Sequence, residues 1–448
     1  MTSHGKPFLG KRSSFSTFSP FRAPGSPGQA ASYSKYSARE EDIGYGLDNN
    51  GSTSMQPTAP YDPAREGHRM ASMNYPSSSL APSSTAYYLP RRSAYFESHW
   101  PLYACDWSHN EWANRDLVAL GTFSEDQSNR ILITQARYDG EQSVEFQATA
   151  EAAVSYPTTK IKWEPASGNN GSGGKLKLIT TGDCLRLWDY DCESYSLQQR
   201  CALVNKSKSE FMPPVTSFDW NRVNPSIVIT SSIDTTCTIW DINTSLAKTQ
   251  LIAHDSEVYD VSFIANSVDI FASVGADGSV RVFDLRSLDH STIIYEPQQP
   301  TPLLRIAGNP QDRNLLATIS QDSTKVYILD IRSPGVPMAI LDGHLKSVNS
   351  ISWAPVGTHR RHILASSGDD CQTLIWDTTS VSGTLTGSGS GSGSSGSSAT
   401  ASNTSSRLVS PIRTYSDTTE INQVCWNGTG DWVGAVCGRG FQAVRLRE

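Results

Sequence analysis

A short phrase recurs along the chain and limits the folds that it can adopt. "SIDTTCTIWD" (residues 232–241) and "GADGSVRVFD" (residues 275–284) both place an Asp six residues before an aromatic residue and close on a second Asp. The closing dipeptide returns at spacings of 52, 43, 46 and 47 residues, as Trp188-Asp189, Trp240-Asp241, Phe283-Asp284, Leu329-Asp330 and Trp376-Asp377. A repeat of this length indicates one supersecondary unit that is stacked several times.

Each unit also begins in a similar way. About 25 residues before the dipeptide, an apolar strand ends in an aromatic residue, namely Trp163, Trp220, Phe263 or Trp353. The fifth unit has Gly308 at this position, so we expect its blade to be locally underpacked. Two less regular units, residues 102–137 and 421–447, flank these five and bring the total to seven.

The period, the Trp-Asp signature and Gly343-His344 are typical of the WD40 β-propeller, in which each blade has four strands. We therefore predict an all-β fold, a seven-bladed WD40 propeller over residues 93–448. The last unit ends after its third strand, near Arg447. Because the ring must close, residues 93–100 should supply the outer strand of the last blade.

Composition sets the remaining boundaries. Residues 1–92 are rich in Ser, Pro, Tyr and Gly and lack periodicity, which predicts a disordered tail. A Gly/Ser-rich run at about residues 383–408 predicts a flexible insertion. A net charge of −7 argues against direct nucleic-acid binding, and no apolar run is long enough to cross a membrane. The sequence has no C-x-x-C pair and no metal-ligand cluster, so we expect no cofactor or metal. We further expect a monomeric propeller whose partners are proteins.

Polar residues recur at matching positions in three units. A buried hydroxyl, imidazole or indole needs a partner, so we expect these residues to form hydrogen-bonded chains inside the blades. The His, Ser and Asp of the sixth unit also permit a nucleophile–base interpretation, which we consider less favoured because the Ser lies within a strand. The sets are His344, Ser366, Asp370 and Trp376 in unit six; His254, Ser273 and Asp277 in unit four; and Thr230, Asp234 and Trp240 in unit three.

Five further residues are candidates for partner contacts. Asp255, Glu257 and Tyr259 enter the fourth unit on the face where loops join adjacent blades, and they suit basic or amphipathic segments. Arg286 and Arg332 follow third strands and are expected on the opposite face. Each of the five could equally be a solvated residue, and each Arg could simply pair with the neighbouring Asp.

Residues 213–241 and 249–296 closely resemble one WD40 scaffold family. It contains plant Transparent Testa Glabra, the petunia anthocyanin regulator and the vertebrate WD-repeat protein sixty-eight, a cullin-four-associated factor. The resemblance covers roughly residues 95–448, and the tail and the insertion are similar in composition to those of a fungal member.

The resemblance implies a scaffold of nucleus and cytoplasm without catalytic activity. Plant members hold basic helix-loop-helix and MYB-type transcription factors, and animal members tether dual-specificity tyrosine-regulated and homeodomain-interacting kinases. An alternative function is a substrate receptor of a cullin-four RING E3 ubiquitin ligase, whose adaptor recognises a W-D-x-R box. "FDLR" and "LDIR", which contain Arg286 and Arg332, match that box except for the Trp. An enzyme is the third hypothesis, and no residue pattern supports it.

Overall fold

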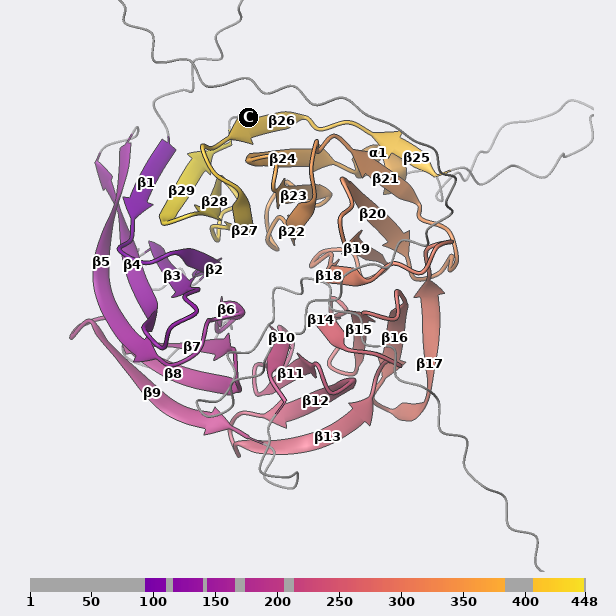
Figure 1. The fold of residues 1–448 in the computed structure, drawn as a ribbon, viewed down its shortest axis with the longest axis horizontal. Coiled ribbons are helices and arrows are strands. Elements are labelled where there is room, and N and C mark those ends of the chain that lie inside the picture. The colour runs from indigo at the N-terminus through magenta and orange to yellow at the C-terminus, as the bar shows by residue number, and fades with distance from the viewer. Residues whose placement is uncertain are drawn as a thin grey trace, which may run out of the picture. The chain divides into compact units, whose positions relative to one another are not determined.

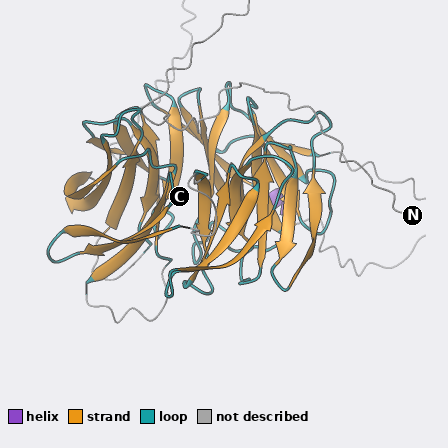
Figure 2. Cartoon of the chain, turned by 60° about the horizontal axis from the view of Figure 1, so that its bottom comes forward, coloured by secondary structure: helices purple, strands orange, loops and turns teal. Residues whose placement is uncertain are grey.

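The computed structural model describes residues 93–109, 116–139, 143–165, 174–204, 213–382 and 406–446. These residues form seven β-sheets that stand around a common axis (Figure 1). In a tilted view, most loops lie at the two ends of the strands, on two faces of the ring (Figure 2). The prediction of an all-β, seven-bladed propeller is confirmed. The expected tail at residues 1–92 and most of the expected insertion, residues 383–405, lie outside the described residues.

The blades follow one another along the chain. Within each blade, the strands are given below in order from the axis outward. Blade one contains β2 (Leu102–Trp107), β3 (Asp116–Thr122), β4 (Asn129–Asp139) and β5 (Ser143–Val154). Blade two contains β6 (Lys160–Trp163), β7 (Lys175–Thr181), β8 (Leu185–Asp191) and β9 (Ser196–Leu203). Blade three contains β10 (Val215–Trp220), β11 (Ile227–Ser232), β12 (Thr236–Asp241) and β13 (Leu246–Ile252). Blade four contains β14 (Val258–Phe263), β15 (Ile270–Gly275), β16 (Val280–Asp284) and β17 (Ser287–Tyr295). Blade five contains β18 (Leu303–Gly308), β19 (Leu315–Ser320), β20 (Lys325–Asp330), β21 (Ala339–Asp342) and, outermost, β25 (Arg407–Val409). Blade six contains β22 (Val348–Trp353), β23 (Ile363–Gly368), β24 (Gln372–Asp377) and β26 (Arg413–Ser416), and the short helix α1 (Thr379–Ser382) follows β24. Blade seven contains β27 (Ile421–Trp426), β28 (Trp432–Cys437), β29 (Gly440–Arg445) and β1 (Ser93–Glu97).

The hydrophobic core lies between the blades. Middle strands such as β3, β11 and β28 are buried along nearly their whole length, because a neighbouring blade packs on each face of the sheet. Among the described residues, each of the seven junctions between adjacent blades has its own core cluster. At the junction of blades seven and one, Trp107, Phe146 and Phe441 meet edge to face with ring centroids 5.2–6.0 Å apart. Stacking of blades therefore accounts for the burial that a single sheet could not achieve.

The ring closes where the first and last described strands meet. Strand β1 pairs antiparallel with β29 and places Phe96 opposite Phe441 (Figure 1). The prediction that residues 93–100 supply the outer strand of the last blade is confirmed. Hydrogen bonding of β1 to β29 gives blade seven four strands, the same number as in blades six and one.

The connection between the third and fourth strands of blade six takes an unusual route. Strand β25 pairs in parallel with β21 at the outer edge of blade five, and the chain then returns to blade six as β26 (Figure 1). Arg407 and Leu408, which fall within the predicted insertion, thus lie in a strand. Leu408 is exposed and Val409 packs against the core of blades five and six. The backbone bonds to β21 fix this short segment, which composition alone could not indicate.

Gly308 does not leave a vacancy in blade five. A Cβ atom at this position would lie 2.9 Å from the carbonyl oxygen of Phe263 and 3.4 Å from Ser262 Oγ. The Gly308 N–H instead donates to Ser262 Oγ at 3.1 Å. The expected underpacking is therefore wrong at this position, because the absent side chain lets the innermost strands of blades four and five approach closely.

Candidate functional site

The polar residues of blade six form one continuous chain of hydrogen bonds. Trp376 Nε1 donates to Ser366 Oγ at 2.8 Å, and Ser366 Oγ lies 2.7 Å from His344 Nε2. His344 Nδ1 lies 3.0 Å from Asp370 Oδ2. Because a carboxylate only accepts, Nδ1 carries the proton and Nε2 accepts from the hydroxyl. Burial lowers the pKa of His344, which favours this neutral form.

This geometry prevents Ser366 from acting as a nucleophile. The side chain is 0% exposed, and its oxygen already accepts the indole N–H while its proton points to His344. A nucleophile must reach its substrate, which a hydroxyl sealed inside a blade cannot do. The arrangement serves the structure, since the Leu345 N–H also donates to Asp370 Oδ2 at 2.9 Å and so ties the loop entering the blade to the next turn.

Blades four and three carry partial versions of this chain. In blade four, His254 Nε2 lies 2.7 Å from Ser273 Oγ and Nδ1 lies 2.9 Å from Asp277 Oδ1, while Phe283 offers no donor. In blade three, Trp240 Nε1 donates to Thr230 Oγ1 at 2.9 Å, and Asp234 accepts from the Thr236 hydroxyl at 2.6 Å. Every residue of the three predicted sets thus lies within its own blade. Asp234 and Asp277 lie in turns between second and third strands and do not form an acid–base pair.

Asp255 is connected to the blade-four chain through an arginine. Arg281 donates to Asp277 Oδ2 at 3.0 Å and to Asp255 Oδ2 at 2.7 Å. Burial would raise the pKa of Asp277, but hydrogen bonds from His254 and Ser279 and the charge of His254 hold it below its ordinary value. The Asp255 side chain is still 84% exposed. Its carboxylate therefore faces solvent while Arg281 holds it in place.

Two faces of the propeller can be defined from these loops. We call the Asp255 face the one formed by the loops between blades and the turns between second and third strands, since Asp255 and Asp277 meet there. Glu257 is exposed on this face, and Tyr259 is half-buried at the start of β14. The structure therefore brings Asp255 and Glu257 together in one loop, with Tyr259 immediately after it.

Arg286 and Arg332 lie on the other face, which we call the Arg286 face. The Leu285 N–H donates to the Asp269 carbonyl and the Ile331 N–H to the Asn314 carbonyl, which places both turns beside loops between first and second strands. Each Arg holds the repeat-closing Asp, with Nη2–Oδ2 distances of 2.6 Å to Asp284 and to Asp330. Both guanidinium groups remain mostly exposed.

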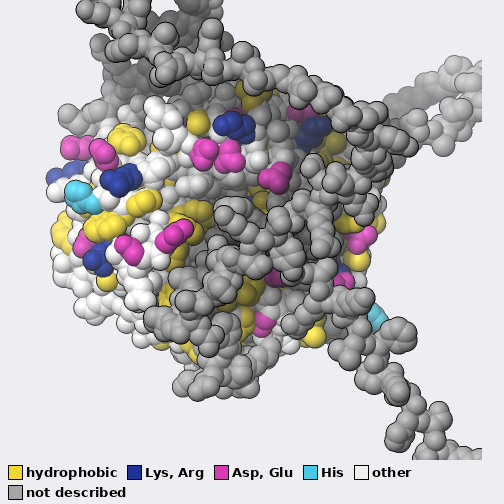
Figure 3. Space-filling model, in the orientation of Figure 1, with side chains coloured by type: hydrophobic (Ala, Val, Ile, Leu, Met, Phe, Trp, Pro, Cys, Tyr) yellow, Lys and Arg dark blue, Asp and Glu magenta, His cyan; other side chains and the backbone are white. Residues whose placement is uncertain are grey.

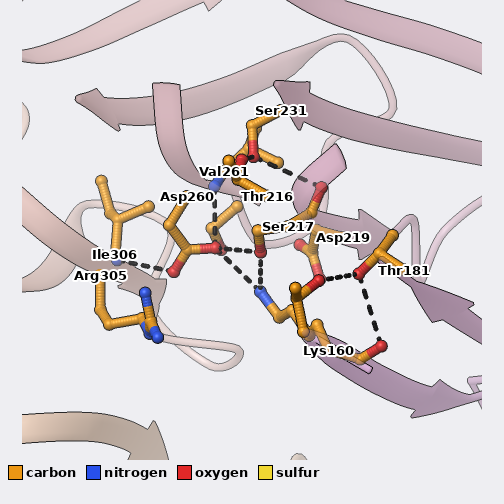
Figure 4. A network of polar contacts seen from close by, with 12 residues as sticks. Lys160, Thr181, Thr216, Ser217, Asp219, Ser231, Asp260, Val261, Arg305 and Ile306 are labelled. Carbon is orange, nitrogen blue, oxygen red and sulfur yellow. Dashed lines mark hydrogen bonds and ion pairs between the residues drawn. The ribbon is translucent and has the colours of Figure 1, made fainter. Parts of the chain in front are cut away.

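Sequence reasoning missed a polar network in the central channel. A cavity of about 970 Å³ is lined by the innermost strands of all seven blades. Within it, Lys160 Nζ donates to Asp260 Oδ1 and to Ser217 Oγ, each at 2.9 Å, and Lys162 Nζ donates to Asp219 Oδ1 at 2.6 Å. Figure 4 shows Lys160 of blade two reaching Asp260 of blade four past Ser217 of blade three.

The same network caps the free edges of the innermost strands. These strands have no neighbour on the channel side, so side chains of the preceding blade accept their N–H groups. Asp106 accepts from Trp163 at 2.8 Å, Asp219 from Phe263 at 2.8 Å, Asp260 from Ile306 at 3.0 Å, Ser350 from Val424 at 3.3 Å and Gln423 from Cys105 at 2.7 Å. Polar residues at alternate positions of otherwise apolar strands, as in "KIKW" (residues 160–163), were the available signal.

Burial and pairing shift the pKa values of these channel groups in opposite directions. Burial raises the pKa of Asp106 to about 6, although the Trp163 N–H opposes the shift. Burial also lowers the pKa of Lys160 despite the neighbouring Asp260. Burial alone would raise the pKa of Asp260, but the charges of Lys160 and Arg305 and the Ser217 hydroxyl keep it below its ordinary value. The Lys160–Asp260 pair is thus an ionic tie between blades two and four.

Metal-binding clusters and membrane-spanning helices are both missing from the part of the chain that the structure describes. There, no group of three or more His, Cys, Asp and Glu side chains is placed to hold a metal ion. No helix in the same residues has the length and hydropathy needed to span a membrane.

Comparison with known proteins agrees with this architecture. The family model of the WD domain, G-beta repeat, matches residues 245–284 and 335–377. A DDB1- and CUL4-associated factor 7 homolog of Dictyostelium discoideum is 43% identical over 78% of this chain and 98% of its own length. WD repeat-containing proteins of Saccharomyces cerevisiae and Schizosaccharomyces pombe are 39% and 37% identical, over 78% and 79% of this chain and 76% and 89% of theirs. The chain therefore belongs to the WD40 repeat family, together with these fungal proteins and the DDB1- and CUL4-associated factor 7 homolog.

Proposed function

We propose that this protein is a non-enzymatic scaffold of nucleus and cytoplasm that holds protein partners on its two faces at the same time. The partners that we propose are transcription factors and kinases of the dual-specificity tyrosine-regulated or homeodomain-interacting type. The observation that carries the proposal is the separation of exposed charge. Asp255 and Glu257 extend from one face, while Arg286 and Arg332 extend from the other. Exposed charges of this kind steer and select partners more than they add affinity.

The Asp255 face suits basic partner segments. Its described loops expose many carboxylates and few cations. The exposed acidic residues there are Glu125, Asp126, Asp255, Glu257, Glu296, Asp322 and Glu420, and the exposed basic ones are Lys346 and Arg439. A basic or amphipathic segment would gain electrostatic attraction across this surface, and Tyr259 could contribute aromatic contact.

A substrate receptor of a cullin-four ligase is the second candidate function. The name of the Dictyostelium relative says that it is a homolog of a DDB1- and CUL4-associated factor. In this chain Phe283 and Leu329 replace the Trp of the W-D-x-R box, but both side chains are buried in their blades. The replacements therefore alter the core, while Arg286 and Arg332 stay on the surface where an adaptor could contact them.

Pull-downs with two charge variants test the scaffold. Asp255→Lys with Glu257→Lys should lose kinase or transcription-factor capture and keep any ligase adaptor, whereas Arg286→Ala with Arg332→Ala should do the reverse. The matched controls are Glu193→Lys, an exposed acid outside the Asp255 face, and Arg439→Ala, an exposed Arg outside the Arg286 face. If both double variants lose both kinds of partner equally while their melting temperatures match the wild type, the two-face scaffold is refuted.

A further inference from the structure

We propose that the mouth of the central cavity on the Arg286 face binds an extended, acidic peptide segment through its apolar side chains and its carboxylates. This inference rests on the proposed scaffold function and specifies the partner chemistry of a site that is distinct from Asp255 and Glu257. The site combines a cavity, an exposed apolar rim and an excess of exposed arginine.

The described part of the mouth is built from loops between first and second strands. Val223 of blade three and Val356 of blade six line the cavity and are 53% and 55% exposed. Because two blades lie between them on one side of the ring and three on the other, they lie on well-separated parts of the mouth. Half-buried Pro165, Ala265 and Pro310 and the buried Pro355 continue the apolar lining between them. Apolar side chains exposed around a cavity are typical of a surface that becomes covered by a partner.

The loops that carry this rim are braced against each other. Asn221 Nδ2 donates to the Ser267 carbonyl at 2.9 Å, which joins blades three and four. Gln311 Nε2 donates to the Pro355 carbonyl at 2.8 Å, which joins blades five and six. A rim held in this way loses little conformational entropy on binding, so more of the contact energy appears as affinity.

Charge selects the occupant. Arg222 is exposed at the mouth and makes no ion pair with any of the residues that the structure describes. Glu164, an acid lining the same mouth, is held by Lys177 at 3.0 Å, and burial lowers the pKa of His109 to about 4, so this side chain is neutral at physiological pH. The described loops of this face also expose Arg286, Arg313, Arg332 and Arg361.

The opposite face repels the same ligand, because its exposed charged side chains are mainly carboxylates. The visible face in Figure 3 carries Asp and Glu side chains at several separate places, with Lys and Arg side chains next to some of them and apolar and neutral ones between. An acidic segment is therefore directed to the Arg286 face, where Arg222 can donate to a carboxylate while Val223 and Val356 cover apolar side chains of the segment. The central cavity that opens at this mouth has a volume of about 970 Å³ over its whole length.

Fluorescence anisotropy with the full purified chain tests this proposal. The probe is a fluorescein-labelled peptide with the sequence Glu-Leu-Asp-Val repeated three times. One control peptide has Gln and Asn in place of the acids, and another has Ser in place of Leu and Val. We expect saturable binding of the first peptide, at least about tenfold weaker binding of both controls, and weakening by added salt.

Matched variants locate the binding site. Arg222→Glu and Val356→Ser should each weaken binding by about tenfold or more. Arg439→Glu on the Asp255 face and Val336→Ser, an exposed Val outside the cavity, should leave it unchanged. Absence of binding, equal binding of the neutral peptide, or equal losses in all four variants would overturn the proposal. The scaffold would survive that result if the Asp255 and Arg286 variants still separate the partners in pull-downs.

Discussion

Replacing Trp376 by Phe removes one hydrogen-bond donor and part of an aromatic ring from the core of blade six. Trp376 is fully buried, and its N–H meets Ser366 Oγ at 2.8 Å. A buried hydrogen bond contributes about 0.5–1.5 kcal/mol net. The smaller ring leaves unfilled space, which we expect to cost about 1 kcal/mol more, as small deletions in cores commonly do. We therefore expect unfolding to require about 2 kcal/mol less free energy.

Blade four shows why the packing loss should not be compensated. There Phe283 occupies the corresponding position, and Phe271 on the neighbouring strand stacks on it with centroids 5.0 Å apart. In blade six the residue opposite Trp376 is Leu364, which is smaller than Phe. The variant thus imitates blade four without the second ring that fills that blade.

A double-mutant cycle separates the hydrogen bond from the packing. Unfolding free energies from urea titrations, followed by far-UV circular dichroism, are measured for Trp376→Phe, Ser366→Ala and the double variant. We expect a coupling energy of about 1 kcal/mol, whereas Trp376→Phe combined with Thr230→Ala in blade three should be additive. A coupling below about 0.3 kcal/mol between residues 376 and 366 would refute the assigned hydrogen bond.

Three further outcomes are expected from the fold and the channel. Deleting residues 1–90 together with 385–405 should leave a cooperative melt within about 10 °C of the wild type, whereas deletion through Trp100 removes β1 and should abolish that melt; similar thermal scans of both would contradict this. Asp106 has a pKa of about 6 against an ordinary value of 3.8, so the stability from its proton is complete below about pH 4 and lost as pH rises to about 6. The difference in unfolding free energy between wild type and Asp106→Asn should therefore change between pH 4 and 6 and level off above, and a flat difference would disprove the shift. Lys160→Met should destabilise the fold by about 3–5 kcal/mol because Asp260 stays buried without its ion-pair partner, and adding Asp260→Asn should recover part of the loss in urea titrations; equal stability of Lys160→Met and wild type would exclude the tie.

The repeat made most of the architecture predictable. Its period set the number of blades, and the incomplete last unit required a strand from residues 93–100, which β1 supplies. The residues of the polar chains could also be named, because hydroxyl, imidazole, carboxylate and indole recur at constant offsets within a repeat. These are local patterns, which a single sequence displays directly.

Contacts between blades left weaker signals. Lys160 and Asp260 are 100 residues apart. Each stands three residues before the aromatic residue that ends its innermost strand, but the residue type at this position varies among the blades, so no recurring residue marked the pair. The parallel pairing of β25 with β21 depends on where the chain returns after residue 405, and composition does not encode that position. Gly308 looked like a missing aromatic residue because sequence shows an absent side chain but not the backbone that approaches it.

The pairing of β1 with β29 also has a consequence for the time at which the chain can fold. Phe96 meets Phe441, so about 345 residues must be synthesised after Phe96 before its partner exists. At roughly 5–20 residues per second, the ribosome needs on the order of 20 to 70 s for that stretch. During this interval blades can form in order from the first, but β1 has no strand to join and blade seven cannot begin. Closure of the ring is therefore a late event in biosynthesis, and the edge that β1 will occupy is the last to gain a partner.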